Sequence, residues 1–302
     1  MGKGGAMIAR QGQRGFGGRV IVPASGLLVG VWLALGIAVA AESAEGPKTA
    51  PTIEKGAQAP HRVTSPHFVT EFSVPPPVGR TYGVLCERAY ANFRRMFNVE
   101  ADEVVWEGKC QVYLFATRDE MVKFATTVTK SLAAAQSAGY TNITTEDPTI
   151  VLYLDKNDQG KLRRTLVHEM THVFLQLFHG GGAKVPVWLH EGFAQYFEFD
   201  SDPEHSRRKD SKARIKRLVA HGQQAPLERF WTMDFPPTDM DSYAQAWSLV
   251  DFMVQRGSAK MTGQFILQIK EGVAQEEALR NTFRCSLPQF EAAWRRYAQQ
   301  SY

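Results

Sequence analysis

The chain has 302 residues, of which 44% are hydrophobic, so it can bury one substantial core and is not a disordered polymer. It carries 35 basic and 31 acidic side chains, but residues 1–40 hold four of the basic ones and no acid. The rest of the chain is therefore neutral overall. This balance argues against a protein that binds nucleic acid through a broad basic surface.

An export signal is predicted at the N-terminus. A basic, Gly-rich stretch precedes an uncharged run at 20–41, and that run closes on Ala38-Val39-Ala40, a small-x-small pattern that a signal peptidase can cut. We expect residues 1–40 to be a signal peptide. The alternative is an uncleaved N-terminal anchor, because about 20 apolar residues can span a bilayer. In either case the protein is exported, as a periplasmic, secreted or outward-facing anchored protein.

The folded domain is predicted to cover 67–302, after a linker at 41–66 that contains four prolines and no periodicity. Alternating side chains at 67–74 predict a first strand, and apolar residues at helical spacing predict a helix over 78–97. Further elements are expected as a strand at 110–116, a helix at 119–126, and two adjacent strands at 138–141 and 149–154.

Helices dominate the second half of the sequence. Apolar positions at helical spacing mark a mostly buried helix over 161–177, which ends at a Gly-rich segment, and another helix follows Pro186 over 187–199. Four more helices are expected at 205–221, 242–256, 262–271 and 287–300. Strands first and helices afterwards indicate an α+β fold, with a small twisted sheet and a mainly helical C-terminal half.

Three cysteines are present, Cys86, Cys110 and Cys285, and one pair of them can form a disulfide in an oxidising compartment. Cys86 and Cys110 are the nearer pair in sequence. The chain contains no CxxC spacing, so a metal site built from cysteines is not expected.

The helix over 161–177 contains the sequence His168-Glu169-Met170-Thr171-His172, an HExxH motif. Spacing of four residues places the two imidazoles on one helix face about one turn apart, where a single cation can bind both. Glu169 is offset by about 100° from His168, and this position suits a base that takes a proton from water held at the metal.

A third ligand is expected, because a catalytic zinc keeps three protein ligands and one open position. His179 and Glu191 are the nearest candidates. The metzincin pattern needs a Gly three residues after the second His and a His three beyond it, but Leu175 and Phe178 occupy these positions. Glu191 follows His172 after eighteen residues, and a second antiparallel helix can return its carboxylate to the metal.

The two segments, HEMTH and WLHEGFAQYFE, resemble the gluzincin metallopeptidases, which carry a WLNEGFA-type segment at this distance. The chain is similar in particular to peptidase-MA-like proteins, many of them exported bacterial proteins. The resemblance covers about 67–300 in outline and is specific over 162–199. It implies a zincin-like fold, one Zn²⁺ at His168, His172 and Glu191, and Glu169 as the catalytic base.

The resemblance also implies a Tyr after the glutamate ligand that stabilises the oxyanion, and Tyr243 has the matching position. A Tyr at a helix start that packs on the core is the alternative. Glu198 and Gln195 lie two turns and one turn after Glu191. Either can orient a ligand imidazole, but both are interpreted as helix-surface residues. His190 is read as structural or substrate-facing.

Two further features concern the substrate. The Gly-x-Met-Glu-Asn segment with which aminopeptidases of this kind bind a free amino terminus does not occur before His168, so aminopeptidase specificity is not predicted. An edge strand at 149–154 is expected to be able to pair with an extended peptide. The basic run at 207–217 is interpreted as a solvated helix face.

The sequence therefore predicts an exported zinc-dependent hydrolase that cleaves peptide bonds in a peptide or protein substrate. Two alternatives stay open: a zinc-stabilised binding or scaffold protein without turnover, and a zinc hydrolase that acts on a non-peptide amide. No nucleic acid partner is expected, and a membrane only through an uncleaved anchor. The oligomeric state is not indicated by the sequence.

Overall fold

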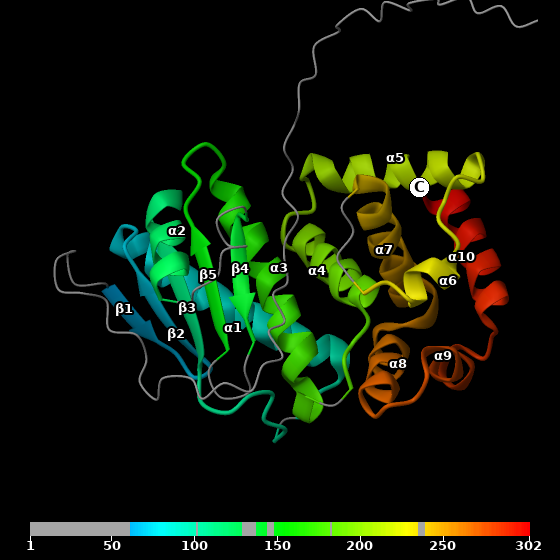
Figure 1. Ribbon diagram of the computed structural model, residues 1–302, viewed down its shortest axis with the longest axis horizontal. Coiled ribbons are helices and arrows are strands. Elements are labelled where there is room, and N and C mark those ends of the chain that lie inside the picture. The colour runs from blue at the N-terminus through cyan, green and yellow to red at the C-terminus, as the bar shows by residue number, and fades with distance from the viewer. Residues whose placement is uncertain (1–60, 101, 129–136, 144–147, 182, 235–238) are drawn as a thin grey trace, which may run out of the picture. The chain divides into compact units, whose positions relative to one another are not determined.

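The computed structural model describes residues 61–302 except 101, 129–136, 144–147, 182 and 235–238 (Figure 1). The predicted signal at 1–40 and most of the predicted linker therefore lie outside the described residues. Within the described chain, strands and one long helix come first and helices follow, so the predicted α+β, zincin-like fold is confirmed. Among these residues, no helix is both long enough and apolar enough to cross a bilayer.

The sheet has five strands in the order β1-β2-β3-β5-β4. Their bounds are β1 His61–Thr64, β2 Phe68–Phe72, β3 Cys110–Phe115, β4 Gly139–Asn142 and β5 Thr149–Tyr153. Strand β3 runs parallel to both of its neighbours, β2 and β5, whereas β1 and β4 are antiparallel to theirs. The sheet is therefore mixed, with its parallel strands in the middle.

Two expectations about the strands were wrong. Strand β1 begins at residue 61, inside the stretch predicted as a linker. It pairs antiparallel with β2, but its residues are mostly exposed, so they lack the buried apolar side chains by which a strand is recognised in a sequence. Strand β5, predicted as an edge, lies between β3 and β4. Its run from Ile150 to Leu152 is fully buried, as is typical of a strand covered on both faces.

Alternation along the inner strands divides the core between the two faces of the sheet. Val112 and Leu114 of β3 face the main core with helices α1 Pro76–Phe97 and α3 Gln159–Leu177. Tyr113 faces the other side, where it packs with Val151 and with Phe124 of helix α2 Arg118–Thr127. The period of two in a strand places these residues on opposite faces.

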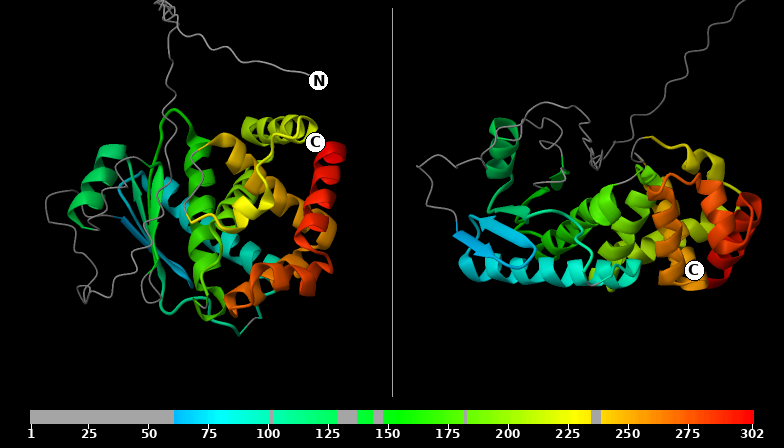
Figure 2. Two further views of the ribbon diagram at one scale, coloured as in Figure 1. Left: turned by 45° about the vertical axis from the view of Figure 1, so that its right-hand side comes forward. Right: turned by 90° about the horizontal axis from the view of Figure 1, so that it is seen from below.

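The later helices pack beside α3, which lies between them and the sheet (Figures 1 and 2). They are α4 Val187–Ser201, α5 Ser206–Ala220, α6 Leu227–Trp231, α7 Met240–Phe252, α8 Ala259–Lys270, α9 Gln275–Phe283 and α10 Leu287–Ser301. A π-helix, Met253–Gly257, extends α7, and a 3₁₀ turn, Phe178–Gly181, follows α3. The predicted helices at 161–177, 187–199, 205–221, 262–271 and 287–300 are confirmed within two or three residues.

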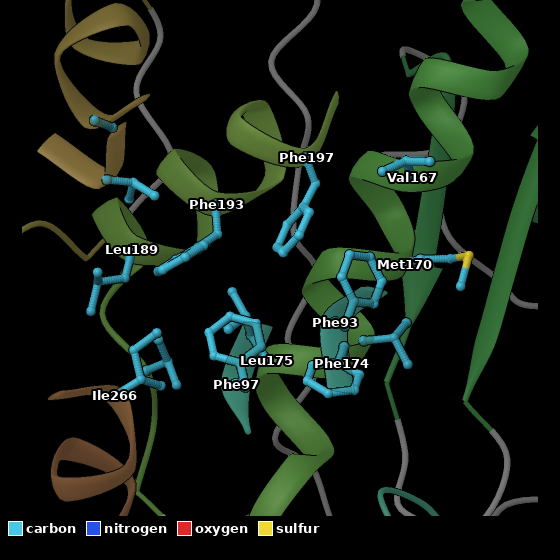
Figure 3. Packing of buried hydrophobic residues seen from close by; sticks show 14 of the residues in the cluster. Phe93, Phe97, Val167, Met170, Phe174, Leu175, Leu189, Phe193, Phe197 and Ile266 are labelled. Carbon is cyan, nitrogen blue, oxygen red and sulfur yellow. The ribbon is translucent and has the colours of Figure 1, made fainter. Parts of the chain in front are cut away.

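An aromatic cluster joins α1, α3 and α4 (Figure 3). Phe93 and Phe97 of α1 contact Phe174 of α3 with ring centroids 5.2 and 5.6 Å apart. Phe93 also meets Phe197 of α4 edge to face, with centroids 4.6 Å apart. Each such ring contributes roughly 1.5–3 kcal/mol by leaving water. The cluster fixes α3 and α4 side by side.

The cysteines are free in this structure. Cys86 and Cys110 are buried, on α1 and β3, and Cys285 is partly exposed. Burial raises the pKa of the Cys86 and Cys110 thiols. Both are therefore small core residues here.

Candidate metal centre

The HExxH motif lies in the middle of α3, and it places His168 and His172 on the same helix face. Their ring centroids are 4.9 Å apart, and their exposed fractions are 4% and 1%. The helix begins where the Asp158 side chain accepts a hydrogen bond from the Lys161 backbone N–H. This N-cap fixes the start of α3 three turns before the histidines.

Helix α4 runs antiparallel to α3 and returns Glu191 to the two histidines. The buried Arg164, near the start of α3, donates to Asp202 at the end of α4 with N and O 2.8 Å apart, and it also pairs with Asp158. The Nε2 atoms of His168 and His172 lie 3.8 and 3.9 Å from the two carboxylate oxygens of Glu191. One potential ligand atom from each residue lies within 4.8 Å of the others.

The three side chains fit a metal ion. Neither Nε2 atom has a hydrogen-bond partner, nor has either oxygen of Glu191, although all four atoms are buried. Buried polar atoms without a partner are costly and rare. A divalent cation between the three side chains satisfies them, and two nitrogens with one carboxylate form a ligand set that leaves a fourth position open.

Charge and burial shift the pKa values of the candidate ligands, in opposite directions at His168 and in the same direction at His172. Burial raises the pKa of Glu191 to about 7, against the lowering effect of His168. Burial also lowers the pKa of His168, but the hydrogen bond and charge of Glu198, together with the charges of Glu191 and Glu169, outweigh it and the net direction is upward. The pKa of His172 is lowered by burial and by the neighbouring His168 and His190. A cation would favour the ionised Glu191 and the neutral imidazoles that ligation requires.

Glu198 lies at the centre, although the sequence suggested a helix-surface residue. It is 4% exposed, and its Oε2 atom lies 3.2 Å from His168 Nδ1. Its other oxygen, Oε1, accepts a hydrogen bond from Arg207 of α5 at 2.7 Å. Gln195 is buried as well, at 2%. The error arose because α4 is covered on almost every side, so its spacing pattern does not separate a polar face from the core.

Glu169 and Tyr243 are close enough to the ligands to interact with them electrostatically. Glu169 is buried, its Oε1 has no partner, and burial raises its pKa to about 7. The Tyr243 hydroxyl, at the first turn of α7, is also buried without a partner. Burial raises the pKa of Tyr243 most, and the charges of Glu191 and Glu169 raise it further.

The remaining histidines near the motif do not contribute ligands. His179 is 44% exposed at its side chain and lies between two acids, with nitrogen–oxygen distances of 3.9 Å to Glu103 and 3.7 Å to Glu271. It is therefore not the third ligand. His190 is buried beside His172, with ring centroids 5.6 Å apart, and its Nδ1 has no partner.

Comparison with known families adds an independent finding. The family model of the peptidase MA superfamily matches residues 109–300, a span that contains both the HExxH motif and Glu191. No curated protein sequence matches the chain.

Proposed function

Since the chain belongs to the peptidase MA superfamily, we propose that it is a zinc-dependent metallopeptidase of the gluzincin kind. The observation that supports this function best is the convergence of His168, His172 and Glu191, whose facing atoms are buried and have no other partner. In this proposal the three residues hold one Zn²⁺. A zinc ion there would polarise the scissile carbonyl and lower the pKa of water to about 7.

Glu169 is proposed as the catalytic base. Its carboxylate follows the first ligand on α3, and its Oε1 is buried without a partner. As a carboxylate, Glu169 accepts a proton from the attacking water and can return it to the leaving amine. Because this residue is not needed to hold a metal, its presence supports a hydrolytic centre over a purely structural one.

Tyr243 is proposed as the donor to the oxyanion. Its hydroxyl is unpaired and buried, and it lies within electrostatic range of Glu169 and Glu191. Burial raises its pKa, so the hydroxyl keeps its proton and remains a donor. A hydrogen-bond donor that is already in place when the charge develops typically raises kcat about 10²–10³-fold.

A peptide or protein outside the cytoplasm is the proposed substrate. The superfamily supports a peptide substrate, and the N-terminal sequence supports export as a periplasmic, secreted or anchored protein. Strand β4, rather than β5, is the outermost strand of the described sheet on the side of α3. It therefore replaces 149–154 as the strand expected to lie nearest an extended substrate.

A zinc-stabilised scaffold without turnover is the second candidate. Its supporting observation is the near-complete burial of the three candidate ligands, at 4%, 1% and 0% exposure, which leaves little of them accessible to a substrate. Glu169, buried beside the ligands, is the feature that argues against it.

Glu169→Gln separates the two functions in the full chain. Bound zinc is measured by elemental analysis, and cleavage is measured with casein and a peptide library, beside the exposed control variant Glu277→Gln. We expect one zinc per chain in all three proteins and a loss of about 10²–10⁴ in cleavage rate for Glu169→Gln alone. A zinc-loaded wild type that cleaves none of these substrates would favour the scaffold or an enzyme for a different amide.

A further inference from the structure

Helix α5 carries a dense basic run, and most of it behaves as the sequence predicted. Arg214 pairs with Asp241 at 2.5 Å and Arg217 approaches the same carboxylate at 3.7 Å, and their side chains are 35% and 57% exposed. Both also line a cavity of about 400 Å³ on this face of α5. Such exposed ion pairs contribute little to stability.

Arg207 differs from its neighbours in the run because its partner is buried. Its Nη1 donates to Glu198 Oε1 at 2.7 Å, and the Glu198 side chain is only 6% exposed. The guanidinium also lies over the Phe199 ring, 6.0 Å from its centroid. It therefore has two fixed neighbours on α4, one polar and one aromatic.

Glu198 has one partner for each of its two oxygens. Oε1 accepts from Arg207, and Oε2 faces His168 Nδ1 at 3.2 Å. A carboxylate held at both oxygens has a fixed plane, and that plane determines the direction in which the imidazole points. The Nε2 atom on the opposite side of the same ring faces Glu191.

We propose that Arg207 is a positioning residue for the metal centre, which acts through Glu198 on the orientation of His168. The proposal rests on the proposed function only in that His168 binds zinc. Without Arg207, Glu198 Oε1 becomes a buried acceptor with no donor. The carboxylate is then held at one oxygen only, and the imidazole loses its fixed orientation.

Zinc affinity is the direct test, measured on the full chain by competition with a chromophoric chelator. Arg207→Met is compared with Arg214→Met, a matched control that lies two turns later on α5 and has the same 35% side-chain exposure. Partners behind a ligand typically change metal affinity 10–100-fold, and we expect about a 10-fold weaker zinc affinity for Arg207→Met. Arg214→Met should bind zinc as the wild type does, and Arg207→Lys should recover part of the affinity.

A double variant distinguishes positioning from a general loss of structure. If Arg207 acts through Glu198, Arg207→Met should weaken zinc binding no further in a Glu198→Gln background. Wild-type zinc affinity in Arg207→Met, or an additive loss in the double variant, would overturn this inference and leave the proposed function intact. A wild type without zinc affinity would overturn both.

Discussion

The helix pair α3–α4 and the later helices α5, α7 and α8 contribute to the same centre in different ways. The pair supplies the three candidate ligands and Glu169 from two short segments. The later helices contribute single side chains, the proposed Arg207 and Tyr243, and α7 packs against α4. Residues of the first kind follow from the period of a helix, whereas those of the second depend on how distant helices pack.

This difference indicates where variation is tolerated. A ligand on α3 or α4 cannot move without loss of the centre, because the positions of the other ligand atoms fix it. Each proposed support on α5 or α7 is a single side chain that is not itself a ligand, so its loss should change zinc affinity or cleavage rate and leave the centre in place. The predictions below test this graded order.

The largest effect is expected from Glu191→Ala. It removes the only carboxylate among the three candidate ligands and leaves two imidazoles with no acid between them. Zinc affinity should fall by more than the roughly 100-fold that loss of an outer partner causes, and cleavage should be abolished. Elemental analysis after dialysis checks this. Retention of one tightly bound zinc would mean that the metal binds elsewhere in the chain.

Tyr243→Phe should have the next largest effect, confined to the rate. Because the hydroxyl has no hydrogen-bond partner in the structure, its removal breaks no bond and should not lower the free energy of unfolding. The rate should fall by about 10²–10³ if the hydroxyl meets the oxyanion. The measurement is kcat/KM together with zinc content. An unchanged rate would assign Tyr243 to packing alone.

The structure brings the three candidate ligands together as the sequence suggested, whereas the contact between Arg207 and Glu198 was not predicted. The His168–His172 spacing and the return of Glu191 need only two helices and a turn, all of which the periodicity indicates. Nothing in the chain marks Arg207 among its basic neighbours, because its contact with Glu198 joins two different helices and the spacing within either helix does not encode it. Glu198 was misread because α4 is covered on almost every side, so its sequence shows no separate polar face.

The same limit applies to the elements. Helix α6 has five residues, too few to show a period, and α9 buries only Ala278 and Leu279 within a charged segment. Neither was predicted. The strands β3, β4 and β5 were located correctly, but their order in the sheet depends on contacts between strands, and strand spacing does not encode it.

Gly192→Ala tests the packing of α4 against α7. A Cβ at this position would lie 2.6 Å from the Ala246 carbonyl oxygen and 2.7 Å from Val250 Cγ2, so backbone must move. We expect a loss of about 1–3 kcal/mol in the free energy of unfolding, as for other overpacked sites, and weaker zinc binding through the adjacent Glu191. Chemical denaturation measures the first effect.

Gly83→Ala is the matched control for that variant. It makes the same change inside α1, where the nearest atom to the new Cβ is Val63 Cγ1 at an ordinary 3.4 Å. It should be neutral or stabilising by up to about 1 kcal/mol, since Ala favours a helix over Gly. Equal losses in the two variants would show that the α4–α7 contact is not specially close.

The smallest effect concerns Lys270, which fixes the end of α3 from α8. Its Nζ donates to the carbonyl oxygens of Leu175 and Gln176, at 3.0 and 2.7 Å, and lies over the Phe178 ring. Burial lowers the pKa of Lys270 from 10.5 to about 8, against the raising effect of Glu103. The unfolded chain therefore binds more protons than the folded chain between pH 8 and 10, and stability linked to Lys270 rises with pH there.

The free energy of unfolding should accordingly gain about 1 kcal/mol from this group between pH 7 and pH 9, since one pKa unit is worth about 1.4 kcal/mol. Lys270→Met isolates the contribution: the wild-type value minus the variant value should increase over that interval. A constant difference would mean that the two carbonyls hold the ammonium charged throughout. In that case a charged ammonium from α8 bonds the last carbonyl groups of α3 over the whole interval.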